Sequence, residues 1–162
     1  MKKLIIFLMA GIIVASCSND GPKKVQLSDK EKVITSFANG EPQIVRQFED
    51  VEGTPEATYQ KEYYDDGNLL KEGPILNNKR HGYWKTYYRN GKLWNESTFS
   101  DGMLIDTIKG YYTDGQLKYQ GIYKNGQKSG VWLFFDEEGK LTDNKVYMQP
   151  GEIREDTLYM AQ

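Results

Sequence analysis

The stretch that decides the fold is YYRNGKLWNESTF, from Tyr87 to Phe99, which places an Asn-Gly pair between two runs of aromatic and polar residues. The stretch YYTDGQLKYQGIY, from Tyr111 to Tyr123, repeats it 24 residues later, with the glycine, the leucine and most of the aromatic residues in the same places. Asn-Gly and Asp-Gly are strong hairpin signals, because Asn, Asp and Gly tolerate the positive φ that tight turns require. The sequence therefore predicts a repeated β-hairpin.

The same pattern extends over much of the chain when it is aligned on the turn glycine. This glycine recurs every 24 residues, at Gly67, Gly91, Gly115 and Gly139. The position seven residues before it holds Trp84, Ile108 and Trp132. The position four residues before it holds Tyr63, Tyr87, Tyr111 and Phe135, and the next position holds Tyr64, Tyr88, Tyr112 and Asp136. One fixed period in so many columns indicates a repeat architecture.

Each repeat contains two short runs rich in Tyr, Trp, Phe and Thr, without the apolar spacing of a helix. We therefore predict an all-β fold, a single elongated antiparallel meander sheet of repeated β-hairpins with a 24-residue period. This repeat domain is expected over residues 33–162, with its clearest repeats at 63–147. In a single-layer sheet, tyrosine rings cover their neighbours while their hydroxyl groups still reach water.

Strand geometry also predicts which side chains share a face. Because side chains alternate along a strand, Trp84, Ile108 and Trp132 should lie on one face together with Tyr88 and Tyr112. Tyr87 and Tyr111 should then point the other way. Some glycines inside the runs are expected to let a ring from the next strand lie flat across the backbone: Gly73, Gly82, Gly121 and Gly130.

The candidate binding surface follows from these columns and comprises Tyr88, Tyr112, Trp84 and Trp132. We expect the tryptophans to be the more buried and the tyrosines to contribute the exposed surface. The alternative is that these rings serve only to hold the fold together.

The N-terminal residues MKKLIIFLMAGIIVASC combine two lysines with an apolar run that is too short for a stable membrane span, as in a secretory signal. Val14-Ala15-Ser16-Cys17 resembles the lipobox of bacterial lipoproteins, which implies cleavage before Cys17 and lipid attachment to it. We predict a lipoprotein signal peptide over residues 1–16 and a flexible tether over 17–32. A plain secreted protein or a short anchor helix is the alternative.

Composition argues against several other classes of protein. The formal net charge is −2 and there is no basic stripe, so no nucleic-acid partner is expected. A single cysteine excludes an internal disulfide framework and a cysteine-cluster zinc site. His81, the only histidine, is expected in an exposed loop, and the carboxylate pairs Asp65-Asp66 and Glu137-Glu138 fall at turns. We therefore expect no enzyme, no catalytic residue, no cofactor and no metal site.

The repeats themselves resemble a known family. YYRNGKLWNESTFSDGM and GIYKNGQKSGVWLFFDEEGKL are similar to the MORN-repeat superfamily, in the variant form common in bacterial proteins, some of which are labelled antitoxin components of toxin–antitoxin systems. The resemblance covers about Tyr63 to Tyr147 and implies an elongated scaffold that engages proteins or, in some relatives, membrane lipids, without a reaction. The middle copy departs from the pattern, because Asp106 and Ile108 replace Gly and Trp, which weakens one aromatic position.

Two classes of function remain open at this stage. The first is a membrane-anchored, non-catalytic scaffold for protein–protein interaction at the cell envelope, with contacts from edge-strand addition or aromatic stacking. Ser18 after the cysteine favours the outer membrane in the sorting rule for such lipoproteins. The alternative is binding of a cell-wall or surface glycan, since regularly spaced Trp and Tyr rings can stack on sugar faces.

Overall fold

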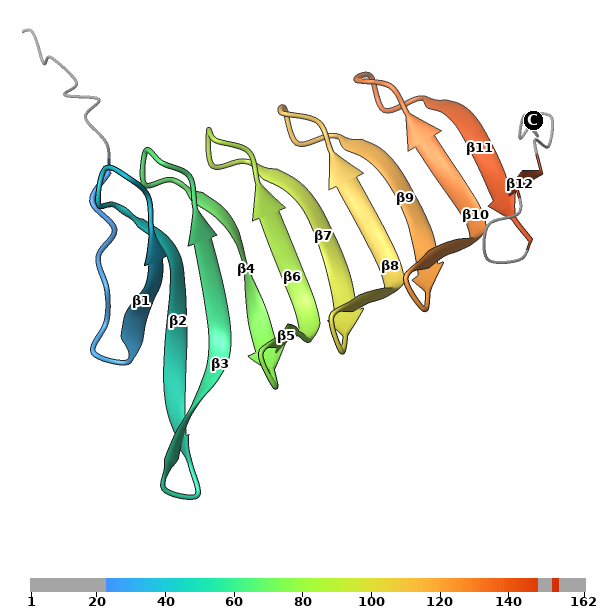
Figure 1. The fold of residues 1–162 in the computed structure, drawn as a ribbon. Coiled ribbons are helices and arrows are strands. Elements are labelled where there is room, and N and C mark those ends of the chain that lie inside the picture. The colour runs from blue at the N-terminus through green and yellow to red at the C-terminus, as the bar shows by residue number, and fades with distance from the viewer. Residues whose placement is uncertain (1–22, 149–152, 155–162) are drawn as a thin grey trace, which may run out of the picture.

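The computed structural model describes residues 23–148 and 153–154 of the chain. Within these residues every helix or strand assigned is a β-strand, and the strands form one open, antiparallel sheet (Figure 1). The predicted all-β meander of repeated hairpins is confirmed. The predicted signal peptide and Cys17 lie outside the described residues.

The strands follow one another across the sheet in chain order, so no connection crosses over another strand. Their bounds are β1 (Glu31–Ser36), β2 (Pro42–Val51), β3 (Thr54–Tyr63), β4 (Leu69–Leu76), β5 (Lys79–Arg80), β6 (Gly82–Tyr87), β7 (Leu93–Ser100), β8 (Met103–Tyr111), β9 (Leu117–Lys124), β10 (Gln127–Phe135), β11 (Leu141–Tyr147) and β12 (Ile153–Arg154). The short strand β5 pairs only with β4.

At one end of the hairpins, two-residue turns have both central residues at positive φ, which is the type I′ geometry that matches strand twist. These pairs are Glu52-Gly53, Asn77-Asn78, Asp101-Gly102 and Asn125-Gly126. The choice of Asn, Asp and Gly at most of these positions follows from their tolerance of the left-handed region.

At the opposite end, each hairpin turns at a glycine of the 24-residue column. In the turn after β6, Tyr88 N–H donates to Lys92 O at 2.8 Å and Gly91 N–H donates to Tyr88 O at 2.9 Å. Gly91 and Gly115 have φ of 80° and 99°, as the predicted turn register requires. Asn90 Oδ1 accepts a further hydrogen bond from Lys92 N–H at 3.1 Å, which explains the Asn before the glycine.

Replacement of Gly91 by valine should lower the free energy of unfolding by at least ~1 kcal/mol, because a β-branched residue is disfavoured at positive φ. A Cβ at this position would meet no atom within 4 Å, so the backbone conformation alone accounts for the loss. Gly91→Asn should cost less, since Asn tolerates this region. Urea denaturation of the three proteins compares these costs, and an unchanged curve for Gly91→Val would contradict the turn assignment.

The two faces of the sheet differ in chemistry. The aromatic face is defined by Trp84, Ile108, Trp132 and their cross-strand partners, and it holds most of the buried core. Trp84 and Trp132 are each only 2% exposed. The Trp84 and Phe99 rings meet in a T-shaped arrangement, with their centroids 6.2 Å apart. The predicted register of the Trp84, Ile108 and Trp132 column on one face agrees with the strand pairing.

The charged face lies on the other side of the sheet. Directly opposed positions across β3, β4, β6, β7 and β8 alternate in sign along one row: Lys61, Glu72, Lys85, Glu96 and Lys109. Opposite charges at directly opposed positions favour this strand register. The row then continues without charge, through Gln120, Leu133 and Asn144.

Glycines inside two strands serve as platforms for the tryptophan rings. A Cβ on Gly73 would lie 2.4 Å from the Trp84 ring, and a Cβ on Gly121 would lie 2.2 Å from the Trp132 ring. The prediction for these two glycines is confirmed. Gly110 forms a third platform that the sequence analysis missed, because a Cβ there would lie 2.2 Å from the Tyr119 ring.

The same prediction is wrong for Gly82 and Gly130. Their φ values are 69° and 65°, and Asp106 at the equivalent position of the middle repeat has φ of 61°. Strand pairing shifts register beside Asp106 and Gly130, so this column provides the backbone for a β-bulge. Glycine is favoured here by its conformation and not by ring packing.

Candidate binding surfaces

The second tyrosine column ties each repeat to the next one. The hydroxyl of Tyr64 donates to Tyr87 O at 3.0 Å, that of Tyr88 to Tyr111 O at 2.7 Å, and that of Tyr112 to Phe135 O at 2.8 Å. Each acceptor is a main-chain carbonyl 23 residues further along the chain. Asp136 interrupts the column in the last repeat.

Tyr88 and Tyr112 therefore differ from the predicted free surface. β6 and β8 end at Tyr87 and Tyr111, so Tyr88 and Tyr112 begin the turns. Both side chains are half-buried, and their hydroxyl groups bond to protein carbonyls instead of reaching freely into water. Their position indicates that they hold successive repeats together.

Tyr112→Phe should lower the free energy of unfolding by ~1 kcal/mol, because the Phe135 carbonyl loses its hydrogen bond while the ring stays. Tyr112→Leu should cost more, since it removes the ring as well. Thermal and urea denaturation measure both differences. A Phe variant as stable as the wild type would show that the hydrogen bond to Phe135 adds no net stability.

Trp84 and Trp132 are also unavailable to a ligand. Their indole Nε1–H groups donate to Pro74 O at 2.8 Å and to Ile122 O at 3.3 Å. Cationic groups cover the two rings: the Arg80 guanidinium carbon lies 4.9 Å from the Trp84 centroid, and Lys128 Nζ lies 4.2 Å from the Trp132 centroid. Both rings are 2% exposed, which confirms the expectation that the tryptophans are the more buried residues of this set and leaves them no free face for a partner in this conformation.

The exposed tryptophan is Trp94, which the sequence analysis did not select. Its side chain is 42% exposed and stacks on Tyr88, with centroids 5.5 Å apart and planes 23° from parallel. Trp94 is the extra residue of a bulge between the pairs Thr86–Asn95 and Tyr87–Leu93. Its column in the other repeats holds Leu70, Lys118 and Thr142, so no aromatic pattern marks it.

A hollow of about 410 Å³ opens on the aromatic face beside Trp94. It lies over β4, β6, β7 and β8, at the middle repeat where Ile108 replaces tryptophan. Its lining is Leu70, Lys71, Arg80, Trp84, Thr86, Trp94, Asn95, Ser97, Phe99, Leu104 and Ile108. Apolar side chains form much of this lining, and cations contribute to its rim.

A second hollow, of about 290 Å³, lies where the charged row gives way to uncharged residues. Thr107, Gln120, Gly121, Ile122, Val131 and Leu133 line it. Val131 is 52% exposed and Ile122 is 40% exposed. From the sequence we expected tyrosine rings, and not bare aliphatic side chains, to cover the exposed surface of the sheet.

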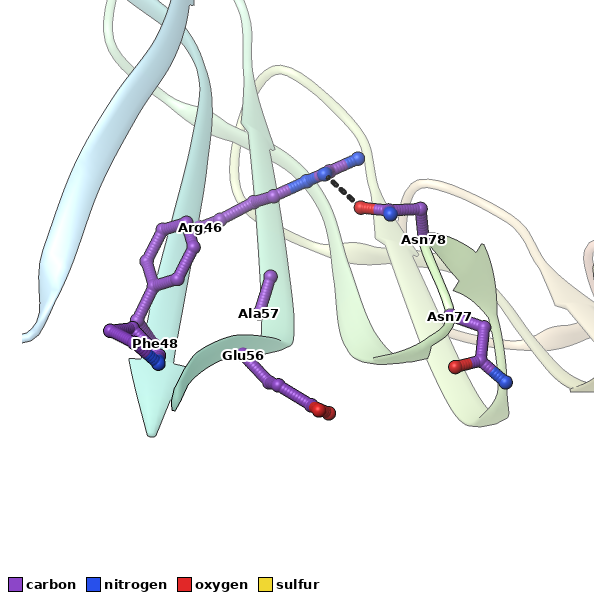
Figure 2. A pocket seen from close by; sticks show the side chains of 7 residues that line it. Arg46, Phe48, Glu56, Ala57, Asn77 and Asn78 are labelled. Carbon is purple, nitrogen blue, oxygen red and sulfur yellow. Dashed lines mark hydrogen bonds between the residues drawn. The ribbon is translucent and has the colours of Figure 1, made fainter. Parts of the chain in front are cut away.

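A third hollow, of about 380 Å³, is polar and lies between the β2–β3 hairpin and the β4–β5 turn (Figure 2). The Arg46 side chain reaches across β3, where Nη1 donates to Asn78 Oδ1 at 2.7 Å. Arg46 Nε also donates to Gln60 Oε1 at 2.8 Å. The arginine therefore braces the hairpins against each other.

Tyrosine hydroxyl groups on the charged face donate hydrogen bonds to glutamates of the charged row. The hydroxyls of Tyr83 and Tyr111 both donate to Glu96, the latter at 2.7 Å. Burial and its own bond to the Glu96 carboxylate raise the pKa of Tyr83 to about 12. Burial and the bond to Glu96 also raise the pKa of Tyr111 above its ordinary value. For Glu96, burial raises the pKa, but the two hydroxyl donors and nearby lysines outweigh it, so the pKa falls. These groups therefore keep fixed charge states near neutral pH.

The remaining polar candidates lie at turns. His81 is exposed between β5 and β6. Asp65 and Asp66 each accept from Arg89 Nη1, at 2.7 Å and 2.8 Å. Within residues 23–148 and 153–154, no cluster of His, Cys, Asp and Glu has the arrangement to hold a metal ion.

Comparison with known proteins gives one informative result. The model of the MORN repeat variant family matches residues 59–77, 80–101 and 107–125. Each match contains one turn glycine with strand residues on both sides, so the family divides the chain at the same hairpins as the structure.

Other comparisons carry little information. No curated protein matches the chain. A solved structure described as a crystal structure of the GtfA/B complex bound to UDP and GlcNAc is similar, with 12% identity and a TM-score of 0.30. The match covers 85% of this chain and 27% of that one, and at this TM-score it carries no argument about fold or function. The period, the turns and the family match together identify the repeats within residues 59–125 as MORN-variant repeats.

Proposed function

We propose that the protein is a non-catalytic scaffold that binds another protein at the cell envelope, where a lipid on Cys17 holds it to the membrane. The observation that carries this proposal is the aliphatic patch on the charged face, around Ile122, Val131 and Leu133. Exposed aliphatic side chains leave ~25 cal/mol per Å² of favourable burial unrealised. A contiguous patch of them marks a protein docking surface more than a single exposed residue would.

A glycan is the second candidate, and Trp94 is the observation that favours it. A half-exposed indole, stacked on Tyr88, offers a flat apolar surface to a sugar ring. The aliphatic patch offers no such flat ring, which makes a protein the better match for that surface. The two candidates therefore use different faces of the sheet.

Site-specific photo-crosslinking separates them. A photoreactive residue at Val131 in the membrane-associated protein should give a discrete crosslinked protein band, and one at the exposed turn residue Thr113 should not. Ile122→Lys should abolish the crosslink at Val131 without changing the melting temperature, because a charge then occupies the patch. Co-purification of a glycan without any crosslinked protein would overturn the proposal in favour of the second candidate.

The anchor is tested at Cys17. Among the described residues, no helix combines the length and apolar character needed to cross a membrane. If Cys17 carries the lipid, Cys17→Ser should accumulate as an uncleaved precursor that lacks the lipid, and its detergent partitioning should differ from that of the wild type, in which several acyl chains together give stable anchoring. Detergent partitioning and processing identical to those of the wild type would contradict the lipoprotein assignment.

A further inference from the structure

The hollow on the aromatic face lies where the middle repeat changes three positions together. In the flanking repeats, a tryptophan lies on a glycine and under a cation: Trp84 with Gly73 and Arg80, and Trp132 with Gly121 and Lys128. The equivalent positions of the middle repeat hold Ile108, Ser97 and Leu104. The middle repeat has thus lost its ring, its glycine platform and its covering cation.

The hollow coincides with the place of that missing ring. Around Trp132, the nearest ring partners are Tyr119, at 6.1 Å between centroids, and Tyr123, at 5.3 Å. The residues 24 positions earlier, Asn95 and Phe99, both line the hollow. Ser97, at the position of the glycine platform, lines it as well. Its volume of about 410 Å³ falls within the range of sites that receive a ligand group.

The charges around the hollow indicate the charge of a partner segment that would bring an aromatic ring into it. Paired strand positions on the aromatic face contain six cationic side chains: Lys32, Arg46, Lys71, Arg80, Lys128 and Lys145. The carboxylates at paired positions of this face are Asp50, Glu62, Asp143 and, at the bulge, Asp106. Lys71 Nζ lies 2.8 Å from Glu62, and Arg80 Nη2 lies 3.9 Å from the same carboxylate, so the rim keeps an excess of positive charge. An acidic partner complements such a face.

We infer that this hollow receives an aromatic side chain from an acidic segment of a partner protein, which completes the ring column that Trp84 and Trp132 form within the chain. The inference rests on the proposed function, since the ring is carried by a protein. Leu104 and Ile108 pack against the ring, and Trp94 at the rim offers a stacking surface. No covalent step is involved.

An NMR titration with the peptide acetyl-Asp-Trp-Asp-amide tests the site directly. The chain contains three tryptophans, so each indole N–H gives its own reporter signal. The signals of Trp84 and Trp94 should shift on binding while that of Trp132 stays in place. A peptide of this size should bind in the range of about 0.1–10 mM. Intermolecular NOEs from the peptide indole to the methyl groups of Leu104 and Ile108 should locate the ring without any variant.

A double variant that copies the flanking repeats provides the matched control. Ser97→Gly with Ile108→Trp rebuilds the platform and the ring, so the chain fills its own hollow. This variant should keep the wild-type NMR signals of distant residues, and its affinity for the peptide should be lower by ~10-fold or more. Ile122→Lys, on the opposite face, should leave the affinity unchanged. Undiminished binding by a folded double variant would overturn the inference, as would the absence of NOEs to Leu104 and Ile108.

The charge of the partner is tested by acetyl-Lys-Trp-Lys-amide. It should bind several-fold more weakly than the acidic peptide at low salt, and the difference should shrink at about 1 M salt as screening shortens the range of the charges. Equal affinity at low salt would overturn the acidic partner. If chitotriose shifts the same indole signals and the acidic peptide shifts none of them, the proposal that the hollow receives an aromatic side chain is overturned. Either failure leaves the crosslink at Val131 untouched, so the proposed function is tested separately.

Discussion

Replacing Trp132 by alanine should lower the free energy of unfolding by ~3–5 kcal/mol, the range for removing a large buried ring. The ring is 2% exposed and lies between Tyr123 and Tyr147, whose centroids are 5.3 Å and 6.0 Å away. Alanine would also leave Ile122 O without its hydrogen bond and Lys128 without the ring beneath it. Urea denaturation followed by circular dichroism measures the loss.

The middle repeat supplies the control for this prediction. Ile108 occupies the same column but is half-buried beside an open hollow, so Ile108→Ala should cost distinctly less than Trp132→Ala. Because each repeat contacts only its neighbours, the loss at Trp132 should appear first as protection lost in β9, β10 and β11 by hydrogen exchange. Equal losses for the two alanine variants would show that the ring does not dominate its repeat.

The sequence predicted the turns and the tryptophan column because both depend on local signals. Gly91 and Gly115 adopt positive φ because each follows an Asn or Asp in a tight turn between two strand-forming runs. The neighbouring residues are enough to predict this. Trp84 and Trp132 follow from period and alternation within one strand. Such features need no knowledge of distant partners.

The tyrosine column could not be predicted in the same way. Tyr88 lies just beyond the end of β6 at Tyr87, so the alternation of side chains along β6 does not predict the partner of its hydroxyl group. The carbonyl that accepts from Tyr88 lies on Tyr111, which only the stacking of successive hairpins brings near. The sequence therefore predicted correctly where this tyrosine lies in its repeat, and predicted wrongly that its hydroxyl group reaches water.

The surfaces were the least predictable part of the molecule, because they arise where the pattern stops. Trp94 has no aromatic counterpart in its column, and its exposure follows from a bulge that the sequence does not mark. Ile108 was visible as a departure, which suggested a weakened aromatic position. The structure adds that Ser97 and Leu104 change with it and that a hollow results. Repeat proteins place function at such departures, because regular columns are already committed to packing.

The second large effect concerns the platform beneath the ring. Gly121→Ser should destabilise the protein by ~3 kcal/mol, because a Cβ at this position would lie 2.2 Å from the Trp132 ring and overpacked cores cost about this much. The flanking Tyr123 and Tyr147 leave the ring little room to move. Urea denaturation measures the loss, as for Trp132→Ala.

The middle repeat shows how the chain itself resolves this conflict, since Ser97 is accompanied there by Ile108. Gly121→Ser combined with Trp132→Ile should therefore cost less than the sum of the two single changes, by ~1–3 kcal/mol, as expected for residues in direct contact. The four proteins of this cycle give the coupling free energy from their denaturation curves. Strict additivity would mean that the serine and the ring do not compete for the same space. A coupling of the expected sign would show that glycine and tryptophan act as one unit, and that replacing both opens a hollow in the sheet without breaking it.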